Sequence, residues 1–178
     1  MKLEKGLVHI YTGEGKGKTT SALGLALRAI KSGLKVYLIQ FMKGDTEEKT
    51  VKQLNLTNFQ YFGHKRNPGK WKWVYKGKVG EEDKQIAAEG LRFAEQTITE
   101  GKYDVVILDE VIIAVWFGLL KEEDLLNLIK KKPVNVELIL TGRRASQKLI
   151  GVADYVSDVT KVKHPYDKGI IAREGIDY

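Results

Sequence analysis

A glycine-rich loop that ends in a lysine and two threonines constrains the fold of this chain more than any other feature. Residues 11–20 read Tyr-Thr-Gly-Glu-Gly-Lys-Gly-Lys-Thr-Thr. The apolar run before the loop, residues 6–11, predicts a buried strand, and apolar residues at helical spacing over 19–31 predict a helix after it. A strand, a glycine loop and a helix in this order are the context of a phosphate-binding P-loop. We therefore expect the chain to bind a nucleotide.

The residue types in this loop suit a triphosphate. Glycines at alternate positions allow successive backbone N–H groups to converge on phosphate oxygens; they are Gly13, Gly15 and Gly17. Lys18 adds a positive charge, and the hydroxyl of Thr19 is a suitable ligand for Mg2+. The loop is one residue shorter than the common GxxxxGKS/T pattern, because Thr12 stands where the first glycine is expected. The alternative, a glycine-rich turn with surface lysines, is disfavoured by the flanking strand and helix.

Composition narrows the class of protein further. The chain has 178 residues, 43% of them hydrophobic, which suits a single domain over residues 1–178. It contains no cysteine, no apolar run of transmembrane length and no signal-peptide pattern, so we expect a soluble cytoplasmic protein without a membrane partner. The net charge of +7 suits an anionic ligand, but the lysines are scattered, so a nucleic-acid partner is not expected.

The rest of the chain alternates between segments that predict strands and segments that predict helices. The predicted strands are residues 34–41, 58–62, 103–108, 135–140 and 155–160. The predicted helices are residues 46–54, 82–99, 121–130 and 145–152. This alternation predicts an α/β fold of three layers, with a mostly parallel central sheet that helices cover on both faces. Ligands of such folds bind at the carboxyl ends of the strands, where the P-loop also lies.

A second motif places two acidic residues at the end of an apolar strand. Residues 105–108 are apolar, and Asp109 and Glu110 follow them. In P-loop proteins an acid at this position holds Mg2+ directly or through water. The two carboxylates could be a metal ligand plus the water-activating Glu of an ATPase, or two members of a metal site. A structural alternative is that they cap the next turn.

Several motifs occur together in one order along the chain. They are residues 12–20 (TGEGKGKTT), 40–44 (QFMKG), 108–110 (LDE), 118–120 (GLL), 141–143 (TGR), 162–169 (VKHPYDKG) and 175–178 (GIDY). In these motifs the chain resembles the ATP:corrinoid adenosyltransferases of the BtuR/CobO/CobA type over nearly its whole length. The shortened P-loop belongs to the pattern of that family. The resemblance implies a RecA-like P-loop NTPase fold.

The resemblance also implies a transferase that uses ATP as the donor of an adenosyl group. In this family the Co(I) of a reduced corrinoid attacks the 5′ carbon of the ribose and expels triphosphate. ATP, Mg2+ or Mn2+, and a corrinoid of the cobalamin or cobinamide type are the implied ligands. No protein nucleophile is required, because cobalt carries the hard chemistry. The implied catalytic residues are Lys18, Thr19 and Glu110.

The site residues implied by the resemblance lie mainly on the loop and the acidic pair. The triphosphate would be held by Lys18 and by the backbone of the loop, which comprises Gly13, Glu14, Gly15, Lys16, Gly17, Lys18, Thr19 and Thr20. Thr19 and Glu110 would hold the metal ion, with Asp109 beside it or bridging through water. Three residues elsewhere would contact the nucleotide: Arg28, Arg143 and His164. A solvated helix residue is the alternative for Arg28, and a turn-stabilising residue is the alternative for His164.

The corrinoid contacts implied by the resemblance are aromatic. Trp71 and Trp73 match family aromatic residues that shape the corrin pocket and displace the lower ligand of cobalt. Core or hairpin residues are the alternative, because aromatic pairs also fill cores. The chain begins five residues before Gly6, where longer members carry an arm that closes over the corrinoid. We therefore expect a corrinoid that is held more openly, or by a partner subunit.

Partners follow from the same resemblance. An electron donor such as a flavoprotein would reduce the corrinoid, and a homodimer is expected. Three rival functions share some of these features: a RecA-like ATPase that produces ADP and phosphate, a small-molecule kinase, and a nucleotide-binding module without catalysis. The nature of the complete substrate, cobalamin or an earlier cobinamide-type intermediate, stays open at this point.

Overall fold

A single six-stranded parallel sheet forms the centre of the molecule. The computed structural model describes residues 2–42, 51, 58–63, 79–173 and 175–176. The strand order is β3-β2-β4-β5-β1-β6, and every neighbouring pair is parallel. The strands are β1 (Val8–Thr12), β2 (Val36–Phe41), β3 (Phe59–Phe62), β4 (Val105–Asp109), β5 (Glu137–Thr141) and β6 (Tyr155–Asp158). Because the strands are parallel, all their carboxyl ends meet at one edge of the sheet.

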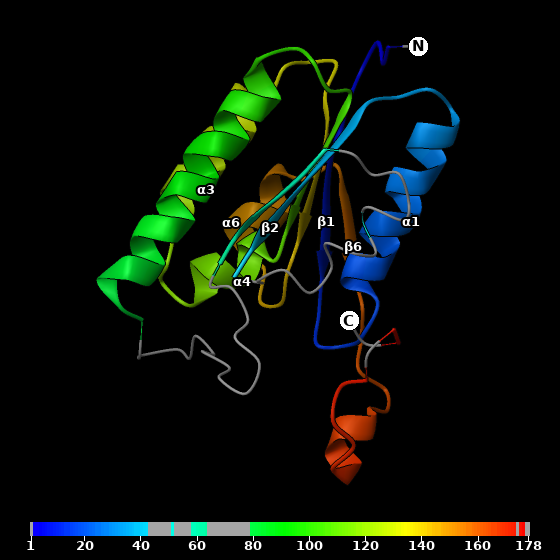
Figure 1. Ribbon diagram of the computed structural model, residues 1–178, viewed down its shortest axis with the longest axis vertical. Coiled ribbons are helices and arrows are strands. Elements are labelled where there is room, and N and C mark those ends of the chain that lie inside the picture. The colour runs from blue at the N-terminus through cyan, green and yellow to red at the C-terminus, as the bar shows by residue number, and fades with distance from the viewer. Residues whose placement is uncertain (1, 43–50, 52–57, 64–78, 174, 177–178) are drawn as a thin grey trace.

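Helices cover both faces of this sheet, which gives three layers (Figure 1). Helix α1 packs on one face, against β1, β2, β4 and β5, while α3 and α4 pack on the other. The helices are α1 (Lys18–Lys31), α3 (Glu81–Thr99), α4 (Val111–Trp116), α5 (Glu122–Lys131) and α6 (Gln147–Val152), with a short 3-10 helix η1 (Pro165–Lys168). None of the helices in the described ranges combines the length and the apolar character that crossing a membrane requires.

The core divides into two clusters because side chains alternate between the faces of each strand. On β4, Val106 and Leu108 pack toward α3, α4 and α5, while Val105 and Ile107 pack toward α1. The central strands β4 and β5 are buried on both faces and therefore read as nearly continuous apolar runs. The sheet thus fixes the direction in which residues at its carboxyl edge emerge.

The structure confirms the predicted α/β fold and shows that its sheet is parallel throughout the described strands. All six predicted strands are present, with ends shifted by up to two residues. Four of the predicted helices are also present, whereas the one predicted over residues 46–54 falls almost entirely outside the described residues. Helix α4 was not predicted, because its six residues are too few to show a helical period.

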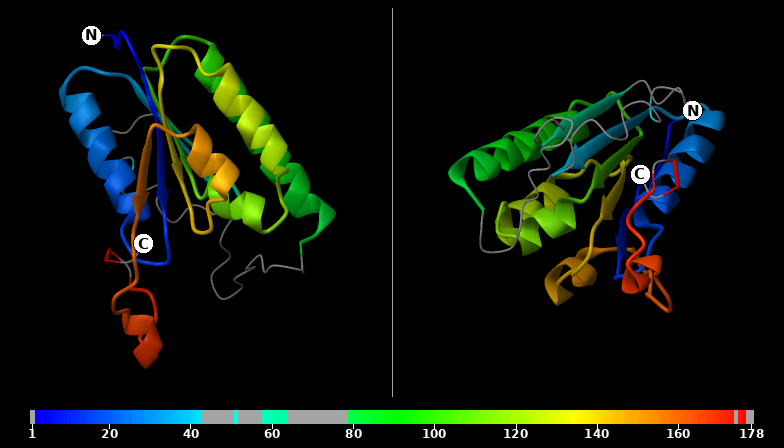
Figure 2. Two further views of the ribbon diagram at one scale, coloured as in Figure 1. Left: turned by 180° about the vertical axis from the view of Figure 1, so that it is seen from behind. Right: turned by 60° about the horizontal axis from the view of Figure 1, so that its bottom comes forward.

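The strand order determines what can meet at the carboxyl edge. Strand β5 lies between β1 and β4, so the loop after β1 and the acidic residues after β4 flank the loop after β5. The chain beyond β6 leaves this same edge and carries η1 away from the body of the molecule (Figure 2). Three loops and the C-terminal segment therefore surround one location.

Candidate nucleotide site

The P-loop closes over its own lysine. Gly13 and Gly17 have φ angles of 98° and 121°, a region that glycine adopts without a side-chain clash. The ammonium of Lys18 donates hydrogen bonds to the carbonyl oxygens of Gly13 at 2.7 Å and Gly15 at 2.6 Å. Burial lowers the pKa of the Lys18 ammonium, and the positive charge of Arg143 lowers it further. The predicted phosphate-binding residues thus lie on one compact turn at the start of α1.

The C-terminal segment packs directly on this loop. The backbone N–H of Gly15 donates to the carbonyl of Val159 at 2.7 Å, and Lys16 donates to the carbonyl of Ile176 at 2.7 Å. A Cβ atom on Gly15 would lie 2.6 Å from the Val159 oxygen, and one on Gly13 would lie 2.1 Å from a carboxylate oxygen of Asp158. Both glycines are therefore required by tertiary packing as well as by the form of the loop.

Asp109 is the centre of a group of polar side chains, which we call the Asp109 hub: the buried Asp109, Gln40 and Thr141, and the half-buried Thr19. The side chains of Thr19 and Thr141 donate to one carboxylate oxygen at 2.8 and 2.6 Å. Gln40 donates to the other oxygen at 2.9 Å. Asp109, Gln40 and Thr141 are 0% exposed. The hub joins β2, β4 and β5 to the first turn of α1 and so orients the hydroxyl of Thr19.

Glu110 leaves the sheet in an unusual backbone conformation. Its φ is 61° and its ψ is 15°, in the left-handed region that few residues other than glycine adopt, at the N-cap position of α4. Its backbone N–H donates to the hydroxyl of Thr141 at 3.0 Å. The negative charge of Glu110 opposes the lowering of the pKa of Lys18, so the two side chains interact electrostatically. Glu110 therefore occupies a helix-cap position, as the structural alternative for the acidic pair supposes. Its side chain, however, makes no cap hydrogen bond.

These residues fit a hard divalent cation. The hydroxyl of Thr19 and the carboxylates of Asp109 and Glu110 are oxygen donors, the type that Mg2+ prefers, and Mg2+ is commonly held by one or two carboxylates together with phosphates. Asp109 accepts hydrogen bonds on both oxygens and is fully buried, which favours an indirect role through Thr19 or water. The same oxygen donors also suit Mn2+.

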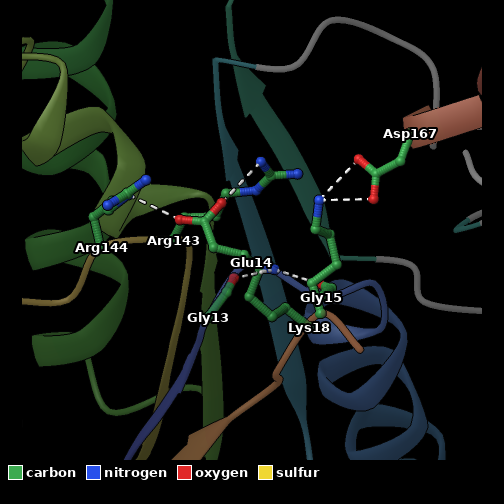
Figure 3. A network of polar contacts seen from close by, with 8 residues as sticks. Gly13, Glu14, Gly15, Lys18, Arg143, Arg144 and Asp167 are labelled. Atoms are coloured by element: carbon green, nitrogen blue, oxygen red, sulfur yellow. Dashed lines mark hydrogen bonds and ion pairs between the residues drawn. The ribbon is translucent and has the colours of Figure 1, made fainter. Parts of the chain in front are cut away.

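Charged side chains from two loops meet beside the P-loop, and we call them the rim cluster: Glu14, Arg143 and Arg144. Figure 3 shows Glu14 between the two arginines. Arg143 pairs with one carboxylate oxygen of Glu14 at 3.2 Å, and Arg144 pairs with the other at 2.8 Å. The hydroxyl of Thr12 accepts from the backbone N–H of Ala145 at 3.2 Å, which ties the same two loops together.

Thr12 and Arg144 were not predicted as functional residues. Thr12 occupies the position of the missing first glycine, and its hydroxyl now has a structural partner on the loop after β5. Arg144 lies next to Arg143 in the sequence but has a φ of 65°, which the sequence does not reveal.

The other predicted site residues are not brought into this group. Arg28 is exposed in the last turn of α1, about 15 Å along the helix from Lys18. His164 is the N-cap of η1, and its Nδ1 accepts from the backbone N–H of Tyr166 at 3.2 Å, which is the turn-stabilising arrangement.

Trp71 and Trp73 lie outside the described residues. Thr20 is exposed on the first turn of α1. Contacts of these residues with a nucleotide or a corrinoid stay predictions.

A small, mostly apolar pocket opens at the same edge of the sheet, beyond β2 and β3. Its lining residues come from the ends of the two strands, the first turns of α3 and one residue after α4: Met42, Phe62, Gly63, Asp83, Ile86, Ala87 and Leu119. Gly63 leads in the sequence to residues 64–78, which contain the two tryptophans. The pocket and the P-loop therefore lie at one edge, on opposite sides of β4.

A parallel sheet with a P-loop after β1 and an acidic pair after β4 defines a P-loop nucleotide-binding protein of the α/β class. The family model described as "ATP:corrinoid adenosyltransferase BtuR/CobO/CobP" matches residues 4–178, and the chain belongs to this family. This finding confirms the resemblance seen in the motifs. It also makes the chain a transferase for ATP-dependent transfer of an adenosyl group to a corrinoid, and it disfavours the ATPase alternative.

Curated relatives agree with the family assignment. The chain is 32% identical over 177 residues to the corrinoid adenosyltransferase of Escherichia coli K12, covering 98% of this chain and 87% of that protein. It is 30% identical over 177 residues to the corrinoid adenosyltransferase CobA of Salmonella typhimurium, with the same coverage. It is 31% identical over 177 residues to that of Pseudomonas aeruginosa, covering 98% and 85%. The similarity thus extends over nearly the full length of each protein.

Proposed function

We propose that this chain transfers the 5′-deoxyadenosyl group of ATP to the Co(I) of a reduced corrinoid and releases inorganic triphosphate. A cobalt–carbon bond forms, the bond between the ribose 5′ carbon and its oxygen breaks, and the leaving triphosphate takes the electron pair. The observation that carries this proposal is the Asp109 hub beneath a shortened P-loop in a chain of this family. The hub fixes the loop that would hold the leaving group.

The residues of the loop would act by position and charge. The ammonium of Lys18 bonds to two loop carbonyls at 2.6–2.7 Å and would turn from them to the triphosphate. The backbone N–H groups at the start of α1 would bind phosphate oxygens, because a helix N-terminus favours anions. Thr19 and Glu110 would hold Mg2+ or Mn2+, with Asp109 behind Thr19. The charge of the bound ion would stabilise the leaving triphosphate.

Arg143 would add a second positive charge at the triphosphate. Its influence on the pKa of Lys18 indicates that the two cations lie near each other, which is favourable only when an anion is between them. Arg28 and His164 would contact the adenosine part. The exposed position of Arg28 on α1 and the partly buried ring of His164 leave both side chains accessible for that contact.

The corrinoid would bind at the same edge of the sheet, on the side of β2 and β3. The apolar pocket formed by Met42, Phe62 and Leu119 supports this location, because a corrin ring needs apolar surface near the nucleotide. Trp71 and Trp73 would displace the lower ligand of cobalt. We propose a substrate of the corrinoid class without choosing between cobalamin and cobinamide forms.

The wider setting is proposed on the same family grounds. The chain would act in the cytoplasm as one domain over residues 1–178, receive electrons from a donor such as a flavoprotein, and form a homodimer. Tyr155 is 53% exposed and Val156 is 42% exposed on the edge strand β6, and such apolar surface supports a contact with a second copy. Sedimentation velocity at two protein concentrations would test the dimer.

A product assay tests the proposed reaction. The protein is incubated with ATP, Mg2+ and chemically reduced cobalamin, and both inorganic triphosphate and a light-sensitive alkyl-cobalt spectrum are followed. We expect both products to appear in equal amounts. ADP in place of triphosphate would contradict the proposal.

Two variants assign roles within this assay. We expect Lys18→Ala to weaken binding of inorganic triphosphate by about 100-fold, because it removes a charge-assisted contact. Trp73→Ala is expected to bind ATP as tightly as the wild type does. It should lose activity with a Co(II) corrinoid that is reduced while bound to the protein. Calorimetry with triphosphate and the alkyl-cobalt spectrum measure the two effects. Equal losses of ATP affinity and of corrinoid activity in the Trp73 variant would indicate a structural role for the ring.

A further inference from the structure

Glu14 places a negative charge in a loop that binds anions. It lies between Gly13 and Gly15, and its side chain is 41% exposed. A carboxylate at this position would repel a triphosphate unless other groups neutralise it, so local charge and proposed function conflict here. Such a conflict is retained only where neighbouring residues compensate for it. The rim cluster provides the compensation.

The two arginines of the rim cluster are held differently. Arg144 bonds to Glu14 at 2.8 Å through Nε, and its guanidinium lies 5.6 Å from the centre of the Trp116 ring. Its backbone has a φ of 65°, in the left-handed region that non-glycine residues rarely adopt. Three features of the fold therefore direct this one side chain to Glu14. Arg144 is a fixed partner of the carboxylate.

Arg143 is held less tightly. It reaches Glu14 through a terminal nitrogen at the longer distance of 3.2 Å, while the side chains of both arginines are more than half exposed. Its charge acts on Lys18, whereas the guanidinium of Arg144 lies over the Trp116 ring of α4. Within the described residues, Arg143 forms its ion pair with Glu14. Exposed pairs of this kind exchange partners at little cost.

We propose that Arg144 is a positioning residue that neutralises Glu14 and thereby releases Arg143 to the triphosphate of ATP. The inference rests on the proposed function only in that a triphosphate binds at the P-loop. Without Arg144, Glu14 would keep Arg143 as its single cation, and this pair would offer the ligand no net positive charge. With Arg144 in place, the cluster carries one net positive charge, which Arg143 delivers. Trp116 contributes by holding the guanidinium of Arg144 away from the ligand.

Binding of inorganic triphosphate, measured by calorimetry, tests this coupling without any corrinoid. We expect Arg144→Ala and Arg144→Gly each to raise the dissociation constant by about fivefold, the upper end for an exposed ion pair. The glycine variant is the control for the backbone, because it relieves the strain at positive φ. Wild-type affinity in the glycine variant alone would show that the turn, and not the charge, matters, and would overturn the proposal.

The decisive measurement repeats both substitutions in a Glu14→Gln background. Glu14→Gln alone is expected to lower the dissociation constant by about threefold, because it frees both arginines. In that background, replacing Arg144 should change the constant by less than about twofold. An equal loss with and without Glu14 would mean that Arg144 attracts the ligand directly, and would overturn the proposal. A wild-type protein that fails to bind triphosphate would instead contradict the proposed function.

Discussion

Asp109 and Glu14 are both carboxylates at the nucleotide edge, and each holds several donors, but their surroundings differ. Asp109 is 0% exposed and accepts from three neutral side chains, whereas Glu14 is 41% exposed and pairs with two arginines. Loss of a buried acceptor leaves its donors without partners in a low dielectric, while water replaces a lost partner at the surface. The hub therefore contributes to stability, and the rim cluster sets the charge that a ligand meets.

The largest expected effect is on the hub. Asp109→Ala should lower the free energy of unfolding by about 3 kcal/mol, because two buried donors, Gln40 and Thr141, and the half-buried Thr19 lose their acceptor. Glu14→Ala is the matched control, and it should lower the free energy by less than about 0.5 kcal/mol. Urea unfolding followed by circular dichroism measures both values. Similar losses in the two variants would show that burial does not separate these carboxylates.

A smaller effect is expected at the backbone between the hub and the rim cluster. Gly15→Ala should destabilise the protein by about 2 kcal/mol, because the new Cβ would overlap the carbonyl of Val159. Gly24→Ala on α1 is the control: a Cβ there meets no atom within 4 Å, and alanine favours the helix by about 0.8 kcal/mol. The midpoint of thermal unfolding should therefore fall in the Gly15→Ala variant and rise in the Gly24→Ala variant. A stable Gly15→Ala protein would mean that the C-terminal segment is not packed on the loop.

The smallest effect is expected at Trp116. Its ring is 36% exposed and lies beneath the guanidinium of Arg144, and exposed contacts of this type contribute about 0.5–1 kcal/mol. Trp116→Leu should therefore weaken triphosphate binding by about twofold, with an unchanged urea midpoint. Trp116→Phe retains an aromatic face and should bind more tightly than the leucine variant. Identical dissociation constants in the two variants would show that the aromatic face of Trp116 does not support Arg144.

Lys18 of the P-loop should make the free energy of unfolding depend on pH. The folded pKa of Lys18 is lowered, chiefly by burial, so the unfolded chain binds more protons at alkaline pH. Stability should consequently rise as the pH increases from the folded pKa of Lys18 to its unfolded value, near 10.4. Lys18→Met should remove this rise, which urea unfolding across alkaline pH measures. An unchanged slope in the methionine variant would assign the dependence to other groups.

The candidate site was predictable where its residues follow one another in the sequence. Lys18, Thr19 and the acidic pair belong to local motifs, and each motif adjoins a strand with a clear apolar pattern. Gln40 and Thr141 were seen only as parts of longer motifs, because nothing in the sequence shows that their side chains reach Asp109. Helix α4 was missed because a single short apolar run has no period, and the left-handed turn at Glu110 leaves no signature in the residue type.

The sequence by itself determined the strand, loop and helix around the P-loop, the alternation that gives an α/β fold, and the family to which the chain belongs. These features depend on residues close together in the chain, whose pattern reports directly on backbone conformation. Only the tertiary structure decided that β5 lies between β1 and β4, that Val159 presses on Gly15, and that Arg144 holds Glu14. Such contacts join distant segments, and their geometry depends on the packing of the whole sheet.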